Sequence, residues 1–313
     1  MYFPYFRGKQ YELITVRENA HRLARAKFIP VVEPVKESLG GLEKALSAVC
    51  DSGGNAIVIV NPFHGSLRSD GGSISTLLKN KYLPRTEIAA GVLLKAGMTV
   101  NEAMACCQQH EDHELSLIHA GFAHGRELAA ALGKLNAEVR HLFVGDVNKL
   151  YQRHFTAGKH VVVKDGFHRQ KRNIDYPDLE KFSELHITYK LDGLYGFGDF
   201  LTVGDDYMES GGPAYSIAIH LTFIDPDDED VMYIYHFKSI RSDTPSDPAG
   251  KFKEALDSMI EKLDQSDSKV FESEAVTEFR NLQLRGHFPG LGYVKKLSMQ
   301  HHIETLAHYF ACV

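Results

Sequence analysis

Short apolar runs rich in β-branched residues recur along roughly the first 200 residues, and each run ends on a polar or turn residue. The clearest runs span residues 28–32, 56–60, 88–94, 115–118, 142–144 and 160–163. A stretch with helical periodicity follows each of them. Strands that alternate with helices imply parallel βαβ units, and in such sheets the ligand site lies at the carboxyl ends of the strands. The pattern therefore predicts where a site lies, but not its chemistry.

A first strand at residues 2–6 and an eighth at 194–203 complete a set of eight. The intervening helices are expected at residues 9–26, from 38 onward, 73–83, from 99 onward, 125–135, 147–154 and 178–185. At the fourth of these, Thr99 and Glu102 have the spacing of a capping box. The count predicts an α/β fold, a TIM-barrel-like (β/α)8 barrel over residues 1–204.

The alternation stops after Gly204. Two strand-like runs, 215–224 and 231–240, flank an acidic turn and predict an appended β-hairpin within residues 205–248. Helical patterns follow at 250–263, 270–284 and 297–310. We expect residues 249–313 to form a C-terminal helical extension that packs on the barrel.

Composition limits the classes of partner and the compartment. The net charge of −6 argues against bulk attraction to nucleic acid or membranes, although a local basic patch stays open. The four cysteines show no CxxC pair and no zinc spacing, which favours a reducing compartment. No apolar run approaches the ~20 residues of a membrane span, and the N-terminus does not read as a signal peptide. The expected location is the cytoplasm.

Glu33 is the first candidate for chemistry, because it follows the apolar run 28–32 directly and precedes Pro34. A carboxylate that leaves a barrel strand can bind a metal ion, act as a base or hold a substrate hydroxyl. It can equally pair with an Arg or Lys at the rim, or cap the next helix. The sequence leaves both interpretations open.

A histidine follows the next strand, in the exit Asn61-Pro62-Phe63-His64. Imidazole titrates near neutral pH and can shuttle protons, although a solvated loop histidine has the same sequence signature. The glycines that follow lack the P-loop ending and the GxGxxG spacing. A phosphate-cradling loop is therefore only weakly indicated here.

Further carboxylates close or border later strands, namely Asp146, Asp165 and Asp199. Together with Glu33 they can form a divalent-metal site, since hard cations need several oxygen ligands. They can instead pair with Lys95 and Lys164. The predicted catalytic residues are Glu33, His64, Asp146, Asp165 and Asp199, with the metal left open.

The most basic loop of the chain reads Phe167-His168-Arg169-Gln170-Lys171-Arg172-Asn173. Cations around an aromatic residue suit phosphate or single-stranded nucleic acid. A solvated loop, or one that docks on an acidic partner, has the same composition. The expected ligand-binding residues are Arg7, Lys9, Asn61, Lys164, Arg169, Lys171 and Arg172.

Two histidines, His220 and His236, lie in the two predicted hairpin strands and can face one another. A functional pair is one interpretation, and core or edge residues with ordinary hydrogen bonds are the other.

Several short motifs are shared with a known family. They are Tyr2-Phe3-Pro4-Tyr5-Phe6-Arg7-Gly8-Lys9-Gln10-Tyr11-Glu12-Leu13, Phe28-Ile29-Pro30-Val31-Val32-Glu33-Pro34, Gly198-Asp199-Phe200 and Ile219-His220-Leu221-Thr222-Phe223. On these, residues 2–240 resemble the phage-type "beta protein" family. The segment from Arg169 to Pro177 is similar to one shared by a related set of bacterial proteins. The resemblance implies a TIM-barrel-like fold in a bacterial or phage context, and it implies no activity and no catalytic residue.

Two functions are compatible with these observations. The first is binding of a phosphate-bearing ligand or nucleic acid at the strand-end face, with metal-assisted phosphodiester hydrolysis as the first reaction class to test and a link to phage defence or mobile elements. The second is a catalytically inactive barrel that binds another bacterial protein through its acidic hairpin turn and C-terminal helices.

Overall fold

Eight parallel strands form the sheet of the N-terminal part of the chain. In the computed structural model, which describes residues 1–83, 86–137, 139–209 and 211–312, these strands are hydrogen-bonded in the order β1-β2-β3-β4-β5-β6-β7-β9. Their bounds are β1 Tyr5–Phe6, β2 Val31–Val32, β3 Ala56–Ile59, β4 Ile88–Lys95, β5 Leu115–Ala120, β6 Arg140–Val144, β7 Lys159–Val163 and β9 Gly196–Gly198. The predicted TIM-barrel-like fold is confirmed.

The N-terminal segment closes the barrel. The backbone N–H of Phe3 donates to Phe197 O at 2.8 Å, and that of Tyr5 donates to Asp199 O at 2.9 Å. On its other side, Pro4 O accepts from the N–H of Val31 at 2.9 Å. The first segment therefore bonds to both β2 and β9, which leaves little free edge in the sheet.

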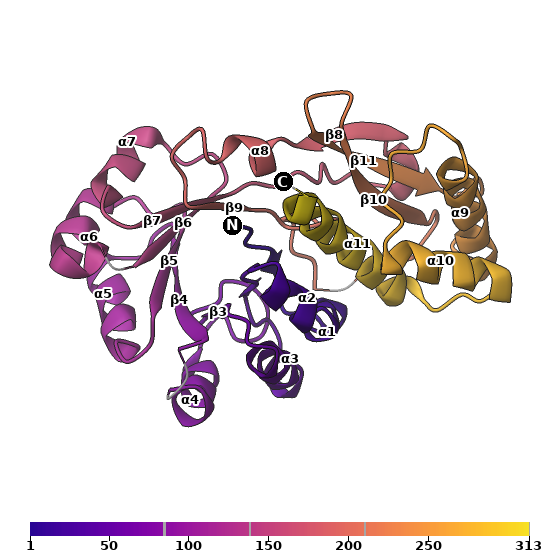
Figure 1. The fold of residues 1–313 in the computed structure, drawn as a ribbon. Helices are drawn as coiled ribbons and strands as arrows, with labels where there is room; N and C mark the ends of the chain where they lie inside the picture. The colour runs from indigo at the N-terminus through magenta and orange to yellow at the C-terminus, as the bar shows by residue number, and fades with distance from the viewer. Residues whose placement is uncertain (84–85, 138, 210, 313) are drawn as a thin grey trace. The chain divides into compact units, whose positions relative to one another are not determined.

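Helices follow most of these strands and lie on the outer side of the sheet (Figure 1). They are α1 Gln10–Glu18, α2 Ala20–Arg25, α3 Gly40–Asp51, α4 Gly72–Lys81, α5 Val100–Gln109, α6 Gly125–Leu132 and α7 Lys149–Gln152, with 3-10 turns η1 Gly133–Ala137 and η2 Arg153–Phe155. The predicted capping box is present, since Thr99 and Glu102 bond reciprocally at the start of α5.

The single helix predicted at residues 9–26 is wrong, because the chain breaks at Asn19 into α1 and α2. The Asn19 side-chain amide donates to Thr15 O at 2.9 Å, and Asn19 Oδ1 accepts from Arg22. An asparagine that bonds to nearby backbone in this way competes with continuous helix. The hydrophobic period continues across the break and therefore hides it.

The strand predicted at residues 194–203 is present only as the short β9. The helix predicted at residues 178–185 is wrong, because this segment is mostly strand β8, Leu179–Ser183. Strand β8 pairs antiparallel with β11, Val231–Lys238, which pairs with β10, Ala218–Asp225. Tertiary pairing overrides local helical preference here. The hairpin predicted around the acidic turn is confirmed as β10 and β11.

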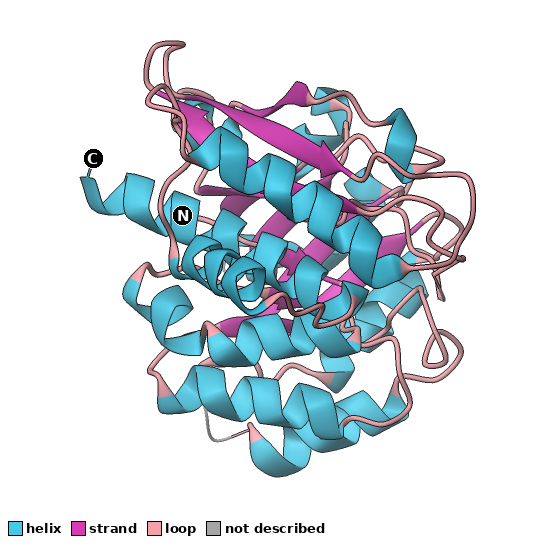
Figure 2. Cartoon of the chain, turned by 90° about the vertical axis from the view of Figure 1, so that its right-hand side faces the viewer, coloured by secondary structure: helices cyan, strands magenta, loops and turns pink. Residues whose placement is uncertain are grey.

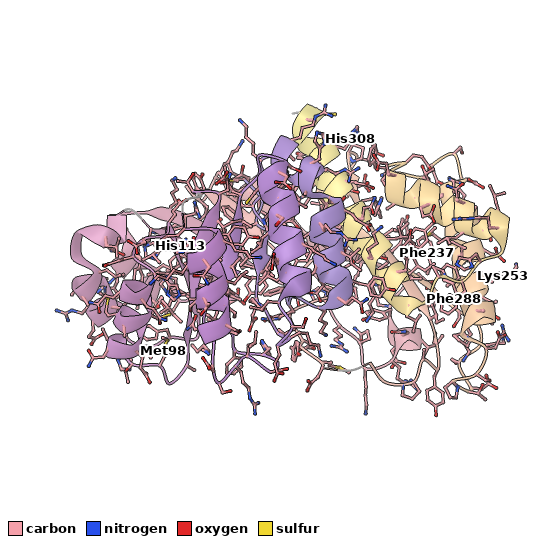
Figure 3. The ribbon with its side chains drawn as sticks, turned by 90° about the horizontal axis from the view of Figure 1, so that it is seen from below. Met98, His113, Phe237, Lys253, Phe288 and His308 are labelled. Carbon is pink, nitrogen blue, oxygen red and sulfur yellow. The ribbon has the colours of Figure 1, made fainter. Side chains whose placement is uncertain are left out.

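Three C-terminal helices pack on this antiparallel sheet. They are α9 Pro248–Leu263, α10 Glu274–Arg285 and α11 Leu291–Cys312. Figure 2 shows helices lying in front of the antiparallel strands. Their buried faces share one hydrophobic core with β10 and β11, which includes Phe237 and has Phe288 packed against it (Figure 3). The short turn η3, Asn173–Asp175, and helix α8, Leu185–Thr188, complete the elements described.

Contacts group the chain into two units. Unit 1 is Met1–Lys164 with Thr188–Asp199, and unit 2 is Asp165–Ile187 with Phe200–Val313. These limits interleave, whereas the predicted limits 1–204, 205–248 and 249–313 are consecutive and stay a prediction. In the described part of the chain, no helix is both long enough and apolar enough to cross a membrane.

Gly91 leaves room for the side chains that fill the barrel. A Cβ atom at this position would lie 2.9 Å from both Ile118 Cδ1 and Ile57 Cγ2. Because alternate strand residues point to the barrel interior, Gly91, Ile57 and Ile118 belong to one interior layer. A small residue at this position is therefore a requirement of packing.

We expect Gly91→Val to lower the free energy of unfolding by about 1–3 kcal/mol, because added methyl groups overpack this layer. The matched control is Gly40→Val, since a Cβ at Gly40 meets nothing within 4 Å. Urea denaturation followed by circular dichroism measures both variants. Equal effects for the two variants would contradict the interior packing described here.

Candidate functional site

A buried carboxylate connects the carboxyl ends of the first three barrel strands. Glu33, just after β2, has 0% exposure. Its Oε2 accepts hydrogen bonds from the Tyr5 hydroxyl at 3.2 Å and from the Arg7 guanidinium. Its Oε1 accepts from the backbone N–H groups of Phe63 at 2.8 Å and His64 at 3.0 Å. The Nδ1 atom of His64 lies 3.1 Å from the same oxygen.

The strands dictate this convergence. Tyr5 and Arg7 are two residues apart at the end of β1, so both side chains lie on one face of the strand. Glu33 follows the neighbouring strand. The loop that carries Phe63 and His64 follows β3, and the carboxylate holds its backbone.

Asn61 fixes where this loop begins. Its Nδ2 donates to Leu93 O at 2.9 Å, and its Oδ1 accepts from the Leu93 N–H at 2.8 Å. The Asn61 side chain thus extends the bonding between β3 and β4 by imitating a peptide group. It was predicted to bind ligand, and in the structure it positions the loop.

The electrostatics of Glu33 make it an anchor rather than a base. Burial by itself raises the pKa of this carboxyl, but the hydrogen bond to His64 and the positive charge of Arg7 outweigh burial and lower the pKa to about 2. The carboxylate is therefore ionised at neutral pH. Its two oxygens together accept about as many hydrogen bonds as their lone pairs allow, which leaves little capacity to take a proton from a ligand.

Lys95 is a site residue that the sequence analysis named only as a possible ion-pair partner. It ends β4, and its Nζ donates to Pro62 O at 3.2 Å and lies 5.3 Å from the centroid of the Phe63 ring. Burial lowers the pKa of Lys95, while the charge of Glu33 opposes that shift. The sequence feature that could have identified Lys95 is its position at the end of a strand.

The other predicted carboxylates have separate partners. Asp146 is 93% exposed at its side chain and pairs with Lys164 at 3.0 Å. Asp165, in unit 2, accepts from the N–H groups of Phe167 at 2.9 Å and Asp205 at 2.7 Å. Both residues therefore have local roles, an exposed ion pair and a loop cap.

Asp199 accepts a hydrogen bond from the Tyr2 hydroxyl at 2.6 Å. Tyr2 and Tyr5 have opposite parity along the same extended segment, so their side chains point to opposite faces of the barrel wall. Glu33 and Asp199 therefore lie on opposite faces as well. Among the residues the structure describes, no three His, Cys, Asp or Glu side chains gather as they would around a metal ion.

The predicted ligand-binding cations divide in the same way. Arg7 pairs with Glu33, whereas Lys9 precedes α1. In unit 2, Arg169 donates to Asp206 O at 3.1 Å, and Arg172 binds both carboxylate oxygens of Asp175. Lys171 is exposed in the same loop. Arg7 is thus the predicted cation that the structure brings to Glu33.

His119, another strand exit, faces the helix layer rather than the barrel interior. Its Nδ1 bonds to the Tyr151 hydroxyl at 2.7 Å, and its Nε2 lies 3.0 Å from His141 Nδ1. His141 Nε2 in turn lies 3.2 Å from Asn136 O. Burial holds the pKa of His119 well below its ordinary value, so this array is neutral and fully bonded.

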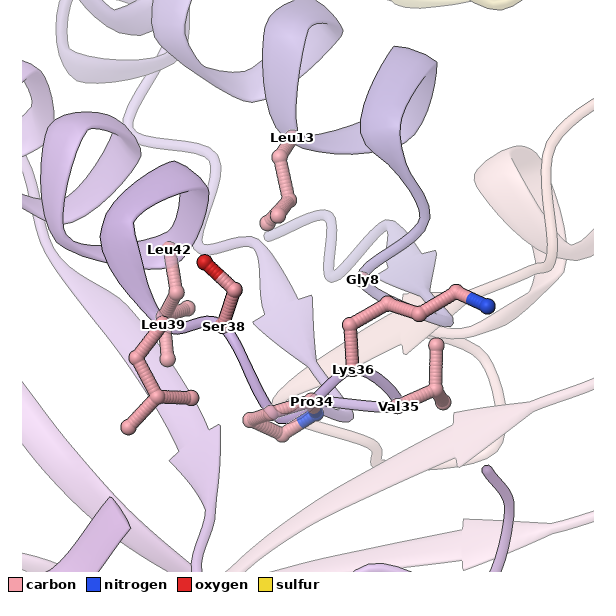
Figure 4. A pocket seen from close by; sticks show the side chains of 8 residues that line it. All are labelled: Gly8, Leu13, Pro34, Val35, Lys36, Ser38, Leu39 and Leu42. Carbon is pink, nitrogen blue, oxygen red and sulfur yellow. The ribbon is translucent and has the colours of Figure 1, made fainter. Parts of the chain in front are cut away.

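A small, mostly apolar pocket is lined in part by Gly8 and Pro34, the sequence neighbours of Arg7 and Glu33. Leu13, Leu39 and Leu42 line it, and Lys36 extends from the loop that follows Glu33-Pro34 (Figure 4). Gly8 also lines it, with φ of +61°, and a Cβ there would lie 2.7 Å from Glu33 O. Glycine at this turn therefore allows β1 to approach the Glu33 backbone closely.

Comparison of the chain with protein-family models and with curated proteins gives no match. The resemblance to the phage-type beta proteins stays a prediction. The function is therefore argued from the Glu33 cluster, which we define as Tyr5, Arg7, Glu33, His64 and Lys95.

We expect Glu33→Gln to lower the free energy of unfolding by about 3 kcal/mol, because removal of one partner leaves the buried Arg7 charge uncompensated. The matched control is Asp146→Asn, whose exposed pair with Lys164 contributes less than about 1 kcal/mol. Urea denaturation measures both. A loss for Glu33→Gln no larger than for Asp146→Asn would contradict the anchoring role.

The Glu33 carboxylate makes the free energy of unfolding depend on pH in the acidic range. The pKa of Glu33 falls from 4.5 in the unfolded chain to about 2 in the fold, so its contribution is complete above pH 4.5 and is lost as the pH falls toward 2. The loss amounts to about 3 kcal/mol at 1.36 kcal/mol per unit. We therefore expect the difference between the urea denaturation midpoints of the wild type and Glu33→Gln to shrink as the pH is lowered from 6 to 2.5. A difference that stays constant over this range would contradict the low pKa of Glu33.

Proposed function

We propose that unit 1 binds a phosphate-bearing ligand at the carboxyl ends of its barrel strands, through Arg7, His64 and Lys95. The observation that supports this is the charge balance of the Glu33 cluster. One ionised carboxylate lies near two basic side chains, Arg7 and Lys95, and near the imidazole of His64. A net positive cluster at the strand ends suits an anion.

The rigidity of the cluster supports the same ligand class. Glu33 holds Arg7 and His64 by direct bonds, so both side chains lose little further freedom when a ligand binds. The half-buried Lys95 is fixed by Pro62 O. Partial burial also strengthens its attraction to an anion, because the local dielectric is lower than in water.

The exposed ring of Phe63 favours a nucleotide over inorganic phosphate. Phe63 is 57% exposed, although it lies between Glu33 and Lys95 in the contact network. An exposed aromatic ring beside cations provides a stacking surface for a base. Single-stranded nucleic acid offers the same chemistry and is separated from a mononucleotide by the experiment below.

Binding, rather than hydrolysis, is the part of the proposal with structural support. The lone pairs of Glu33 are already engaged, and Asp146, Asp165 and Asp199 have other partners. His64, whose side chain is 23% exposed, is the group of the cluster suited to proton transfer. A bacterial or phage setting, and a role as a protein-binding barrel, stay predictions.

Isothermal titration calorimetry with adenosine monophosphate and with a short single-stranded oligonucleotide tests the proposal. We expect Lys95→Gln to weaken nucleotide binding about tenfold, equivalent to about 1.4 kcal/mol. Lys164→Gln, at the exposed pair with Asp146, is the matched control and should leave affinity unchanged. The proposal would be refuted if neither compound bound, or if the two variants lost affinity to the same extent.

A further inference from the structure

Four side chains of unit 2 form one continuous hydrogen-bonded array across its antiparallel sheet. His168 Nδ1 lies 3.0 Å from Glu180 Oε2, and Glu180 Oε1 lies 3.0 Å from His236 Nε2. His236 Nδ1 then lies 2.7 Å from His220 Nδ1. His220 and His236 are direct cross-strand partners on β10 and β11, so the sheet register imposes the pairing that the sequence suggested.

The bonds determine where the protons lie. An ionised Glu180 only accepts, so His236 must donate from Nε2. In its neutral form His236 then has a lone pair on Nδ1, and His220 must donate from its own Nδ1. The Nε2 atom of neutral His220 is therefore an acceptor at the end of the array. In the described residues His220 Nε2 has no hydrogen-bond partner, and His220 as a whole residue is of intermediate burial.

The surroundings decide which ring can carry a positive charge. Burial, His236 and Lys295 all hold the pKa of His220 well below its ordinary value. Burial also lowers the pKa of His236, but the adjacent Glu180 opposes that shift. The other charges near His236 are Lys238 and Asp178, which pair with each other at 2.8 Å. A proton shared by the two rings is thus best held on His236, beside Glu180.

Aromatic rings fix the orientation of both imidazoles. Tyr176 stacks on His236 with centroids 4.6 Å apart, and its ring meets the edge of His220 at 4.9 Å. Phe167 contacts His220 in a T-shaped geometry, also at 4.9 Å. Both aromatic residues flank the basic loop that contains Arg169. The His220 ring is therefore held in place, and the nearby cation that acts on it is Lys295.

We propose that His220 is the ligand-binding end of a proton relay, and that it binds an oxyanion group together with one proton. The proton from solvent or from the acidic form of the ligand bonds to His220 Nε2. The proton on His220 Nδ1 moves to His236 Nδ1, which makes His236 an imidazolium paired with Glu180. His220 stays neutral in total and presents an N–H donor to the oxyanion. His236 and Glu180 are positioning residues for this site.

Histidine-selective ¹⁵N NMR on the whole chain tests the relay. The probes are sulfate for a tetrahedral oxyanion and acetate for a carboxylate, because neither titrates near neutral pH. Saturation should convert His220 from the Nδ1–H to the Nε2–H tautomer and should protonate His236. Whichever probe produces this shift identifies the shape of the oxyanion. If neither probe shifts the His220 signals, the proposal is overturned.

Calorimetry in two buffers of different ionisation enthalpy counts the protons. Binding should take up about one proton at pH 8, and affinity should fall about tenfold per pH unit as the pH rises. Glu180→Gln keeps an acceptor for His236 Nε2 but removes the charge, so proton uptake should be lost. His168→Gln, on the other oxygen of Glu180, is the matched control and should keep it.

The outcomes separate this site from the one proposed in unit 1. Measurements are repeated in the Lys95→Gln variant, where binding that needs the Glu33 cluster is weakened but His220 is unchanged. If the array only satisfies its own hydrogen bonds, the protein should bind the anion without taking up a proton, or should not bind it at all. Retention of proton uptake in Glu180→Gln would likewise overturn the relay.

Discussion

The buried ion pair of Glu33 with Arg7 is the interaction on which the barrel rim depends. A carboxylate taken out of water is unfavourable unless hydrogen bonds and a countercharge replace the lost hydration. Glu33 recruits those partners from the ends of β1, β2 and β3. The same bonds that satisfy the charge therefore fix the positions of Arg7 and His64. Stability and site geometry have one physical cause here, so a substitution at Glu33 cannot change one without the other.

Barrel closure places these partners. Tyr5 and Arg7 reach Glu33 because the N-terminal segment bonds to both β2 and β9. The alternation of side chains along that segment also directs Tyr2 to the other face, where it binds Asp199. Two carboxylates that look equivalent in sequence thus acquire different environments. The alternation of side chains along a strand, rather than position in the sequence, places Glu33 and Asp199 on opposite faces.

The sequence predicted the barrel because strand period and polar exits are local patterns. The same patterns pointed to Glu33, Arg7 and His64, which the structure brings together, while their role in binding stays a prediction. It could not predict that Asp146 would remain in solvent beside Lys164, since ion pairing depends on loop geometry. Strand β8 was mistaken for a helix because its pairing partner β11 lies far along the chain. Lys95 was underrated because its contact with Phe63 arises only when β3 and β4 lie side by side.

Two histidine arrays in the described part of the chain show how bonding capacity decides what a titratable group can do. In unit 1, His119 and His141 bond at both nitrogens to Tyr151, to each other and to Asn136 O, so neither has an atom left for a ligand. In unit 2, the Glu180 carboxylate sets the direction of each donor along the chain of rings, and that direction ends at His220. A carboxylate at one end and an available nitrogen at the other make a relay; two fully bonded ends make a structural core.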